Sequence, residues 1–239
     1  MDQLLGLDLG VIEILDDLND RLNGSRIKRL KEIKESRDII YTIHSPILDM
    51  NIASANDRFR SLSMKFVTTS IDHAREIDAR LVVVHPGNHS PLEYLHPRIH
   101  WDTNMESIGR LIKYAEDLGV GVGIENMPCN TPMMLQKASE FQALADAGLQ
   151  VPITLDVGHA NTTGQLQAFL DSMAPQIVHV HLHDNRGSAD EHLAIGKGNV
   201  DWNLIRSRLS FEKITGIIEC NTLSDAAASL SQMHRLYKK

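Results

Sequence analysis

The sequence predicts an α/β fold of the (β/α) TIM barrel class, formed by a single domain over residues 1–239. The first reason is that short apolar runs alternate with longer amphipathic runs, which is typical of parallel strands covered by helices. The second is that polar residues of catalytic type end most of these apolar runs, as they do at the active face of such barrels. A doubly wound open sheet is the alternative, but no G-x-G-x-x-G motif follows the first strand to support it.

Seven apolar runs have the length and composition of strands, so we expect the first strand of an eight-stranded barrel to be missing. Several of them end at proline, glycine, asparagine or aspartate, which favours the strand interpretation. The expected strands cover residues 11–15, 39–44, 81–85, 121–125, 151–157, 177–183 and 216–220.

Between the strands, apolar residues recur near helical spacing, which predicts amphipathic helices. Gly119 follows one of these segments and is a typical helix C-cap. The expected helices cover residues 25–36, 56–79, 102–118, 134–147, 165–173, 202–209 and 225–236.

The composition and net charge of the chain argue against several classes of protein. The formal net charge of -7 disfavours broad, non-specific binding of nucleic acid. No apolar run approaches the length of a membrane span, and the first residues lack a basic leader region. The two cysteines, Cys129 and Cys220, form no disulfide framework. We therefore predict a cytoplasmic protein that binds no membrane, and we predict no protein partner.

The most informative segment is IVHVHLHDNRGSADEHLAIGKGN, residues 177–199, which holds four of the twelve histidines. Strand alternation places His179, His181 and His183 on one face, and Asp190 and His192 follow two residues apart in a polar loop. Buried imidazoles without partners cost free energy, and imidazole and carboxylate are the usual ligands of zinc. The segment therefore predicts a metal site, with hydrogen-bonded or solvated histidines as the alternative.

Similar residues end the other expected strands and would converge on the same face of a barrel. Taken singly, a glutamate here could be a surface carboxylate and His85 a turn residue. Their recurrence on successive strands favours a metal site. The candidate ligands are His44, His85, Glu125, Asp156, His159, His181, Asp190, His192 and Glu219.

These residues stand in the motifs H-P-G, E-N, D-x-x-H, H-L-x-D-x-[KR], D-x-H-x-x-x-G-x-G-N and a late E. With this set, the chain resembles the xylose isomerase-like barrel superfamily and, within it, the endonuclease IV family. The resemblance covers nearly the whole chain from Val11. It implies three zinc ions, the first held by His44, His85 and Glu125, the second by Glu125, Asp156, His181 and Glu219, and the third by His159, Asp190 and His192.

The chain departs from the endonuclease IV pattern outside the ligands. The stretch that would read DNA is DDLNDRLN, whose only basic residue is Arg21. Ile47 and Leu48 stand where the family inserts bulky residues into DNA, and Lys197 stands where the family often has glutamate. These departures do not change the candidate ligands, but they concern residues that would contact DNA, so they count against a DNA substrate.

The isomerases and epimerases of the same superfamily keep one metal, which the resemblance assigns to Glu125, Asp156, His181 and Glu219. In them the two glutamates shuttle a proton beside a carbonyl or hydroxyl group. A metal-binding protein without catalysis is a third alternative.

We therefore predict an enzyme that depends on two or three zinc ions, with manganese or another divalent metal as alternatives. The predicted activity is endonuclease IV-like phosphodiester hydrolysis of abasic-site DNA or a related phosphoester. Epimerisation or isomerisation of a small sugar or sugar phosphate is the alternative. Glu125 and Glu219 are the expected catalytic residues, and His89, His183 and Lys197 are the expected substrate contacts.

Overall fold

The computed structural model describes residues 7, 9–212 and 214–237. The chain forms two compact units, each described here by itself. The N-terminal unit comprises Leu9–Ile124 and Pro132–Met134, and the C-terminal unit is built mainly from Glu125–Thr131 and Leu135–Lys239.

The strands of the N-terminal unit pair in parallel and follow one another in chain order. Their register places Leu15 beside His44 and His44 beside Val83, so the carboxyl ends of these strands lie at one edge. The strands are β1 (Val11–Leu15), β2 (Ile40–His44), β3 (Leu81–Val84) and β4 (Gly121–Glu125), of which the last residue, Glu125, is assigned to the C-terminal unit.

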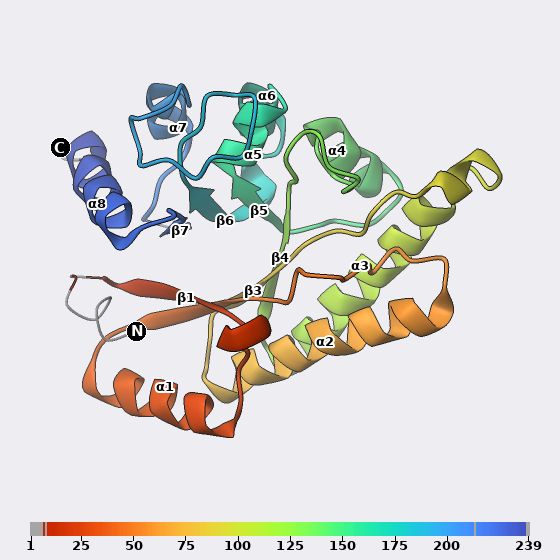
Figure 1. Cartoon of the computed structure of the whole chain (residues 1–239), viewed down its shortest axis with the longest axis horizontal. Helices are drawn as coiled ribbons and strands as arrows, with labels where there is room; N and C mark the ends of the chain where they lie inside the picture. The colour runs from red at the N-terminus through yellow and green to blue at the C-terminus, as the bar shows by residue number, and fades with distance from the viewer. Residues whose placement is uncertain (1–6, 8, 213, 238–239) are drawn as a thin grey trace. The chain divides into compact units, whose positions relative to one another are not determined.

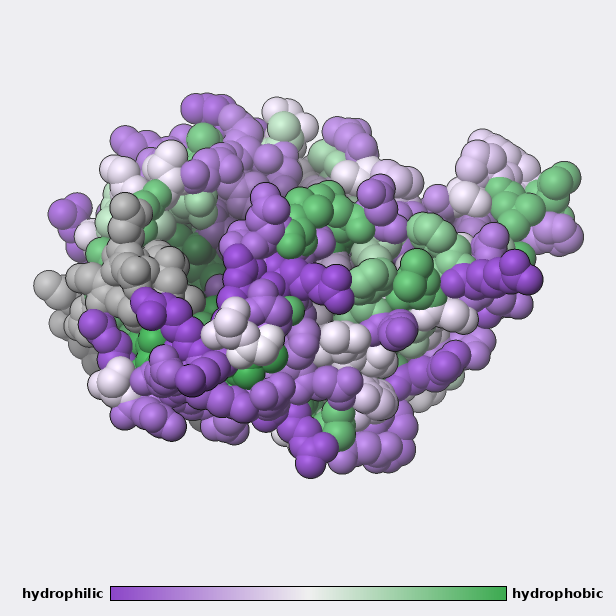
Figure 2. All heavy atoms as spheres, turned by 60° about the horizontal axis from the view of Figure 1, so that its bottom comes forward, coloured by the Kyte–Doolittle hydropathy of each residue, from purple (hydrophilic) through white to green (hydrophobic). Residues whose placement is uncertain are grey.

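Three helices lie on one side of these strands (Figure 1): α1 (Gly24–Ser36), α2 (Asp57–Glu76) and α3 (Ile99–Leu118). Asn23 and Asn56 cap α1 and α2, because their side-chain oxygens accept hydrogen bonds from the first backbone N–H groups of each helix. The helices bury apolar stripes, while the outward face seen in Figure 2 is mainly hydrophilic. Two short 3-10 helices, η2 (Leu18–Asp20) and η3 (Pro91–Tyr94), lie in the loops.

The C-terminal unit has three parallel strands whose register sets Asp156 beside His181 and His181 beside Ile217. These strands are β5 (Ile153–Asp156), β6 (Ile177–Leu182) and β7 (Thr215–Ile218). Its helical segments are α4 (Ala138–Asp146), α5 (Val157–Thr162), α6 (Leu166–Ser172), η4 (Ala174–Gln176), α7 (Trp202–Arg208) and α8 (Leu223–Tyr237) (Figure 1).

The seven expected strands are all present among the described residues, each within two residues of the expected bounds. The expected helix bounds at residues 79 and 102 are wrong by three residues, since α2 ends at Glu76 and α3 begins at Ile99.

Two further differences have a clear local cause. The helix expected from residue 134 begins only at Ala138, because Leu135 has a left-handed backbone and Glu140 accepts a hydrogen bond from the N–H of Lys137. The strand expected to reach residue 157 ends at Asp156, which caps the unpredicted helix α5.

Within the described residues, no helix combines the length and the apolar character that a membrane crossing requires. Both cysteines are free thiols. The cytoplasmic location and the single domain over residues 1–239 stay predictions.

Candidate metal centre

Four ligand-type side chains gather at the carboxyl ends of strands, and we name them the strand cluster: Glu125, Asp156, His181 and Glu219. Glu125 ends β4, Asp156 ends β5, His181 lies in β6 and Glu219 follows β7. The Nδ1 atom of His181 lies 3.2 Å from Oε1 of Glu125 and 3.3 Å from Oε1 of Glu219. Glu125, Asp156 and His181 are buried, so their donor atoms face one another rather than solvent.

A second group, the loop cluster, contains His159, His183, Asp190 and His192. Oδ2 of Asp190 lies 3.2 Å from Nε2 of His159 and 3.1 Å from Nε2 of His192. The rings of His183 and His192 are stacked, with centroids 4.0 Å apart and planes 10° apart. One potential ligand atom from each of the four residues lies within 4.8 Å of the others, so the group could hold a single metal ion.

The two clusters touch. Nδ1 of His159 lies 3.4 Å from Oε1 of Glu125, while its Nε2 faces Asp190. Nε2 of His183 lies 3.0 Å from Oδ1 of Asp156. The eight residues therefore form one continuous set of oxygen and nitrogen donors.

Two side chains at the strand ends fix this geometry. Oδ1 of Asp156 accepts the backbone N–H of His159 at 2.7 Å, which caps α5 and orients His159 toward the clusters. Asn126 accepts the N–H of Asp156 at 2.8 Å and donates its Nδ2–H to the carbonyl oxygen of Asp156 at 3.1 Å. The sequence interpretation did not assign Asn126 a role, although the E-N motif marked its position.

Asp184 organises the segment that carries Asp190 and His192. Its Oδ2 accepts hydrogen bonds from the N–H of Gly196 at 2.8 Å and from the indole of Trp202 at 3.0 Å. Its Oδ1 accepts the N–H of Val200 at 3.1 Å. His192 has a left-handed backbone with φ 49°, a strained conformation of the kind that functional sites retain. The role of Asp184 was missed, because it depends on residues 12 to 18 positions further along the chain.

The loop cluster has a strong internal electrostatic field. Burial lowers the pKa of His159, but the charge of Asp156 and the bond to Asp190 outweigh it and raise that pKa to about 10. Burial also lowers the pKa of His192, and the bond to Asp190 outweighs it and raises that pKa to about 9. Burial raises the pKa of Asp190, but its bonds to the two imidazoles hold that pKa well below its usual range. The cluster therefore favours positive charge at its centre.

The donor chemistry fits a divalent metal. Four carboxylates and four imidazoles face one another, and such N and O donors are the usual ligands of zinc and manganese. A cation at each cluster would neutralise the carboxylates and replace the protons that the histidines otherwise hold. The metal-binding prediction for the clusters is thus consistent with the geometry, while the identity of the metal stays a prediction.

His44 and His85 come together in the N-terminal unit. Their rings are in edge contact, with centroids 4.9 Å apart, and His44 is buried at the end of β2. Glu125, the third ligand predicted with them, belongs to the C-terminal unit. Their assignment to one metal stays a prediction.

The acidic stretch after β1 is tied down by internal hydrogen bonds. Asp16 is buried and accepts bonds from Leu22 N–H at 2.6 Å, Ser70 Oγ–H at 2.7 Å and the His73 ring at 3.0 Å. Oδ2 of Asp17 accepts the N–H groups of residues 47 and 48 at 3.0 and 3.1 Å. Both aspartates therefore hold loops in place.

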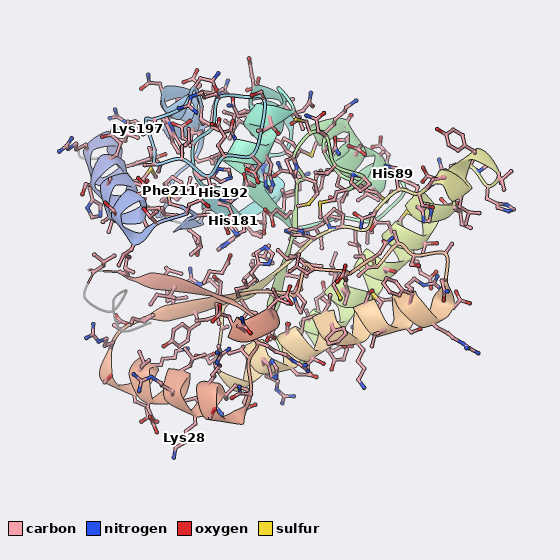
Figure 3. The ribbon with its side chains drawn as sticks, in the orientation of Figure 1. Lys28, His89, His181, His192, Lys197 and Phe211 are labelled. Atoms are coloured by element: carbon pink, nitrogen blue, oxygen red, sulfur yellow. The ribbon has the colours of Figure 1, made fainter. Side chains whose placement is uncertain are left out.

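The expected substrate contacts lie in different environments. His89 is exposed and lies 2.9 Å from the carboxylate of Glu93. Lys197 is exposed and lies apart from His181 and His192 in Figure 3. His183 is fully buried in the loop cluster. The predicted contacts of these residues with substrate stay predictions.

Comparison with known proteins gives three informative similarities. An uncharacterised protein of Methanocaldococcus jannaschii, MJ1311, is 32% identical over 236 residues, which cover 96% of this chain and 80% of that protein. A crystal structure of a D-tagatose 3-epimerase-like protein is 30% identical, with a TM-score of 0.93 over 99% of this chain and 91% of the other. Endonuclease IV from Thermus thermophilus is 19% identical, with a TM-score of 0.75 over 98% and 91%, and this similarity shows the fold alone.

The relatives thus include proteins named as epimerases and proteins named as endonuclease IV, and they do not separate the two classes. The predicted (β/α) TIM barrel fold is confirmed by the family whose pattern the sequence matches over residues 4–239. By this match, which spans all the residues of both clusters, the chain belongs to the xylose isomerase-like TIM barrel family.

Proposed function

We propose that this protein is a divalent-metal enzyme that hydrolyses phosphoesters, with endonuclease IV-type cleavage of a phosphodiester as its reaction. The observation that carries the proposal is the contact between the strand cluster and the loop cluster through His159 and His183. A second set of donors beside the first supports more than one ion. An enzyme that only moves a proton on a sugar needs the strand cluster alone.

In this proposal, Glu125, Asp156, His181 and Glu219 hold one ion, and His159, Asp190 and His192 hold another. Bound ions of this kind neutralise charge on phosphoryl oxygens and lower the pKa of water. Phosphoryl transfer needs charge stabilised on both the entering and the leaving oxygen, so adjacent clusters suit it.

Within the site, Asn126 and Asp184 keep the donors in position. Asn126 fixes the backbone of Asp156. Asp184 fixes the segment that presents Asp190 and His192. Such orienting contacts matter because small displacements of ligands reduce metal affinity and activity.

The proposed substrates are abasic-site DNA or a smaller phosphoester. The net charge of -7 favours a smaller substrate. Asp16 and Asp17 accept hydrogen bonds within their own unit, but both carboxylates keep their negative charge, which also disfavours DNA at the stretch DDLNDRLN.

The second candidate function is epimerisation of a small sugar or sugar phosphate. Two carboxylates, Glu125 and Glu219, lie within 3.3 Å of the same imidazole of His181. This pairing suits a proton shuttle on the two sides of a carbon atom. The 30% identity to a D-tagatose 3-epimerase-like protein also supports this candidate.

The deciding experiment assays zinc-loaded and manganese-loaded protein on an abasic-site duplex, on bis(p-nitrophenyl) phosphate and on a panel of ketoses in deuterated water. Hydrolysis that is lost in Asp190→Ala and His192→Ala supports the proposal. Deuterium incorporation into a ketose, with no phosphoester hydrolysis, overturns it and establishes the second candidate.

A further inference from the structure

His183 contacts both clusters, but in two different ways. Its side chain is fully buried immediately after β6. Its Nε2 atom lies 3.0 Å from Oδ1 and 3.2 Å from Oδ2 of Asp156, a member of the strand cluster. An ionised carboxylate only accepts hydrogen bonds, so this nitrogen carries a hydrogen and donates it to Asp156. A ring nitrogen that carries a hydrogen has no lone pair left for a metal ion.

The second contact is with the ring of His192 in the loop cluster. The two rings are stacked, with centroids 4.0 Å apart and planes 10° apart. The lone pair of an imidazole nitrogen lies in the plane of its ring, so an ion bound by His192 lies outside the plane of the His183 ring. The stack therefore supports His192 without adding a ligand to the ion that His192 would bind.

The two oxygens of Asp156 have different surroundings. Oδ1 accepts the backbone N–H of His159 at 2.7 Å as well as the Nε2–H of His183. Oδ2 lies 3.8 Å from Nδ1 of His181 in the strand cluster. Because two donors of the protein occupy Oδ1, Oδ2 remains as the oxygen for an ion held together with Glu125 and His181.

The chain makes room for the His183 ring through Gly158. A Cβ atom at position 158 would lie 2.0 Å from Cε1 and 2.5 Å from Nε2 of His183, which is far inside van der Waals contact. The backbone of Gly158 does not need a positive φ, so the glycine serves space rather than conformation. It stands in α5 two residues after Asp156, where any larger residue would displace the imidazole from that carboxylate.

We propose that His183 is a positioning residue for the metal ions of both clusters and a ligand of neither. Its Nε2–H group fixes the carboxylate of Asp156 for the strand cluster, and its ring supports the ring of His192 for the loop cluster. The inference rests on the proposed function only in that it requires an ion in each cluster. Groups that orient metal ligands in this way raise metal affinity by about ten- to a hundredfold.

The first test identifies the ligands directly. The protein is labelled with an NMR-active nitrogen isotope on histidine and loaded with an NMR-active cadmium isotope. Cadmium should couple to ring nitrogens of His181 and His192, while Nε2 of His183 keeps its hydrogen. Nδ1 of His183, which is buried and has no hydrogen-bond partner among the described residues, should show no coupling either. Coupling of cadmium to either nitrogen of His183 would overturn the proposal.

Two substitutions separate the hydrogen bond from the stack. His183→Phe keeps an aromatic ring but removes the donor, so the strand ion should bind about tenfold more weakly while the loop ion is unchanged. His183→Gln keeps an N–H donor but removes the ring, so the loop ion should bind about three- to tenfold more weakly while the strand ion is unchanged. Competition with a chromophoric chelator measures zinc affinity, with the strand ion isolated by Asp190→Ala and the loop ion by His181→Ala.

Control variants exclude general effects of substitution. His234→Phe and His234→Gln change an exposed imidazole in α8 of the same unit and should alter neither affinity. Gly158→Ala should displace the His183 ring and reproduce the weakening of the strand ion. Thermal unfolding in EDTA and far-UV circular dichroism show whether each variant is folded, and the cadmium measurement on the unsubstituted protein decides the question if one is not.

The outcomes separate this inference from the proposed function. The inference is overturned if His183→Phe and His183→Gln weaken the same ion equally, or if neither variant changes an affinity. A protein that shows the expected affinity changes but cleaves no phosphoester would overturn the proposed function alone.

Discussion

Two buried aspartates, one in each unit, show how a structural carboxylate differs from a ligand. Asp16 accepts hydrogen bonds from a backbone N–H, a hydroxyl and one imidazole. Asp156 accepts one backbone N–H and one imidazole, but it also lies in a cluster with Glu125 and His181. A single buried carboxylate is satisfied by neighbouring donors, whereas several together need a cation. The excess of like charges, rather than burial itself, marks the candidate metal site.

The largest effect on metal content and activity should appear when one histidine in the C-terminal unit, His181, is substituted and compared with one in the N-terminal unit, His73. His181→Ala removes an imidazole shared by two glutamates, so we expect the loss of at least one ion and of at least about 10³-fold in phosphodiesterase activity. His73→Ala removes an imidazole that bonds only Asp16 among the contacts described, and metal content should stay unchanged. Elemental analysis and rate assays check both variants. Equal metal loss in the two would contradict the distinction between the units.

The second prediction concerns the stability of the N-terminal unit, where Asp16 has a structural role. Asp16→Ala should lower the free energy of unfolding by about 3 kcal/mol, because three buried donors lose their acceptor. Asp57→Ala, which breaks an exposed pair with Arg60, should cost less than about 1 kcal/mol. Urea denaturation of the metal-loaded proteins measures both values. Loss of metal from folded Asp16→Ala would show that Asp16 contributes to the centre after all.

The pH dependence of zinc binding should distinguish the loop cluster from an ordinary set of histidines. In the metal-free protein His159 and His192, with pKa values raised to about 10 and about 9, hold protons at pH 7 that zinc must displace. Affinity should therefore rise with pH by up to about tenfold per pH unit for each proton released, and level off above pH 9 to 10. Zinc titrations at a series of pH values measure this slope, and an affinity that levels off near pH 7 would contradict the raised pKa values.

The same shifts have a consequence for the metal-free fold, with a definite sign. A histidine whose pKa is raised on folding stabilises the protein fully below its unfolded pKa of about 6.5. That stabilisation falls progressively above about pH 6.5 and is gone once the pH has passed the folded pKa values of about 9 and about 10. Calorimetric melts in EDTA should show a falling Tm over this range, and zinc should suppress the fall. A flat profile would mean that the histidines are not paired with Asp190 in solution.

The smallest effect on the kinetics is expected at Lys197, an exposed residue of the C-terminal unit. Lys197 is exposed, so Lys197→Ala removes a solvated charge and should raise KM about threefold with kcat unchanged. Steady-state kinetics at low and high salt measure this change. A fall in kcat of about 100-fold would instead place Lys197 beside the reacting atoms.

Much of the fold was predictable because strands and helices have distinct sequence periods. The runs from Val11 and Gly121 became strands with the expected bounds, and Gly119 ends α3 as expected. Helix α5 was not predicted, since its six residues are too few for a periodic pattern and the side chain of Asp156 starts it. The start of α4 was misplaced because the left-handed turn at Leu135 has no glycine or asparagine to mark it.

The ligand candidates were found for a similar reason: parallel strands bring their carboxyl ends to one edge, so strand-end residues can be grouped from sequence. The burial of each of these residues, and the segments that each contacts, could not be predicted from the sequence. Alternation along β6 placed His183 on the correct face, but its contact with Gly158 joins two segments that only the folded chain brings together.

The anchoring of residues 185–202 by Asp184 has a consequence for how such proteins diversify. Hydrogen bonds from Gly196, Val200 and Trp202 converge on this one carboxylate, and a backbone bridge also joins Asp184 to Leu193. The segment is therefore anchored through residues other than the two ligand candidates, Asp190 and His192. Substitutions at Asp190 or His192 should therefore change the donors of the loop cluster while the anchor at Asp184 and the strands beneath stay in place.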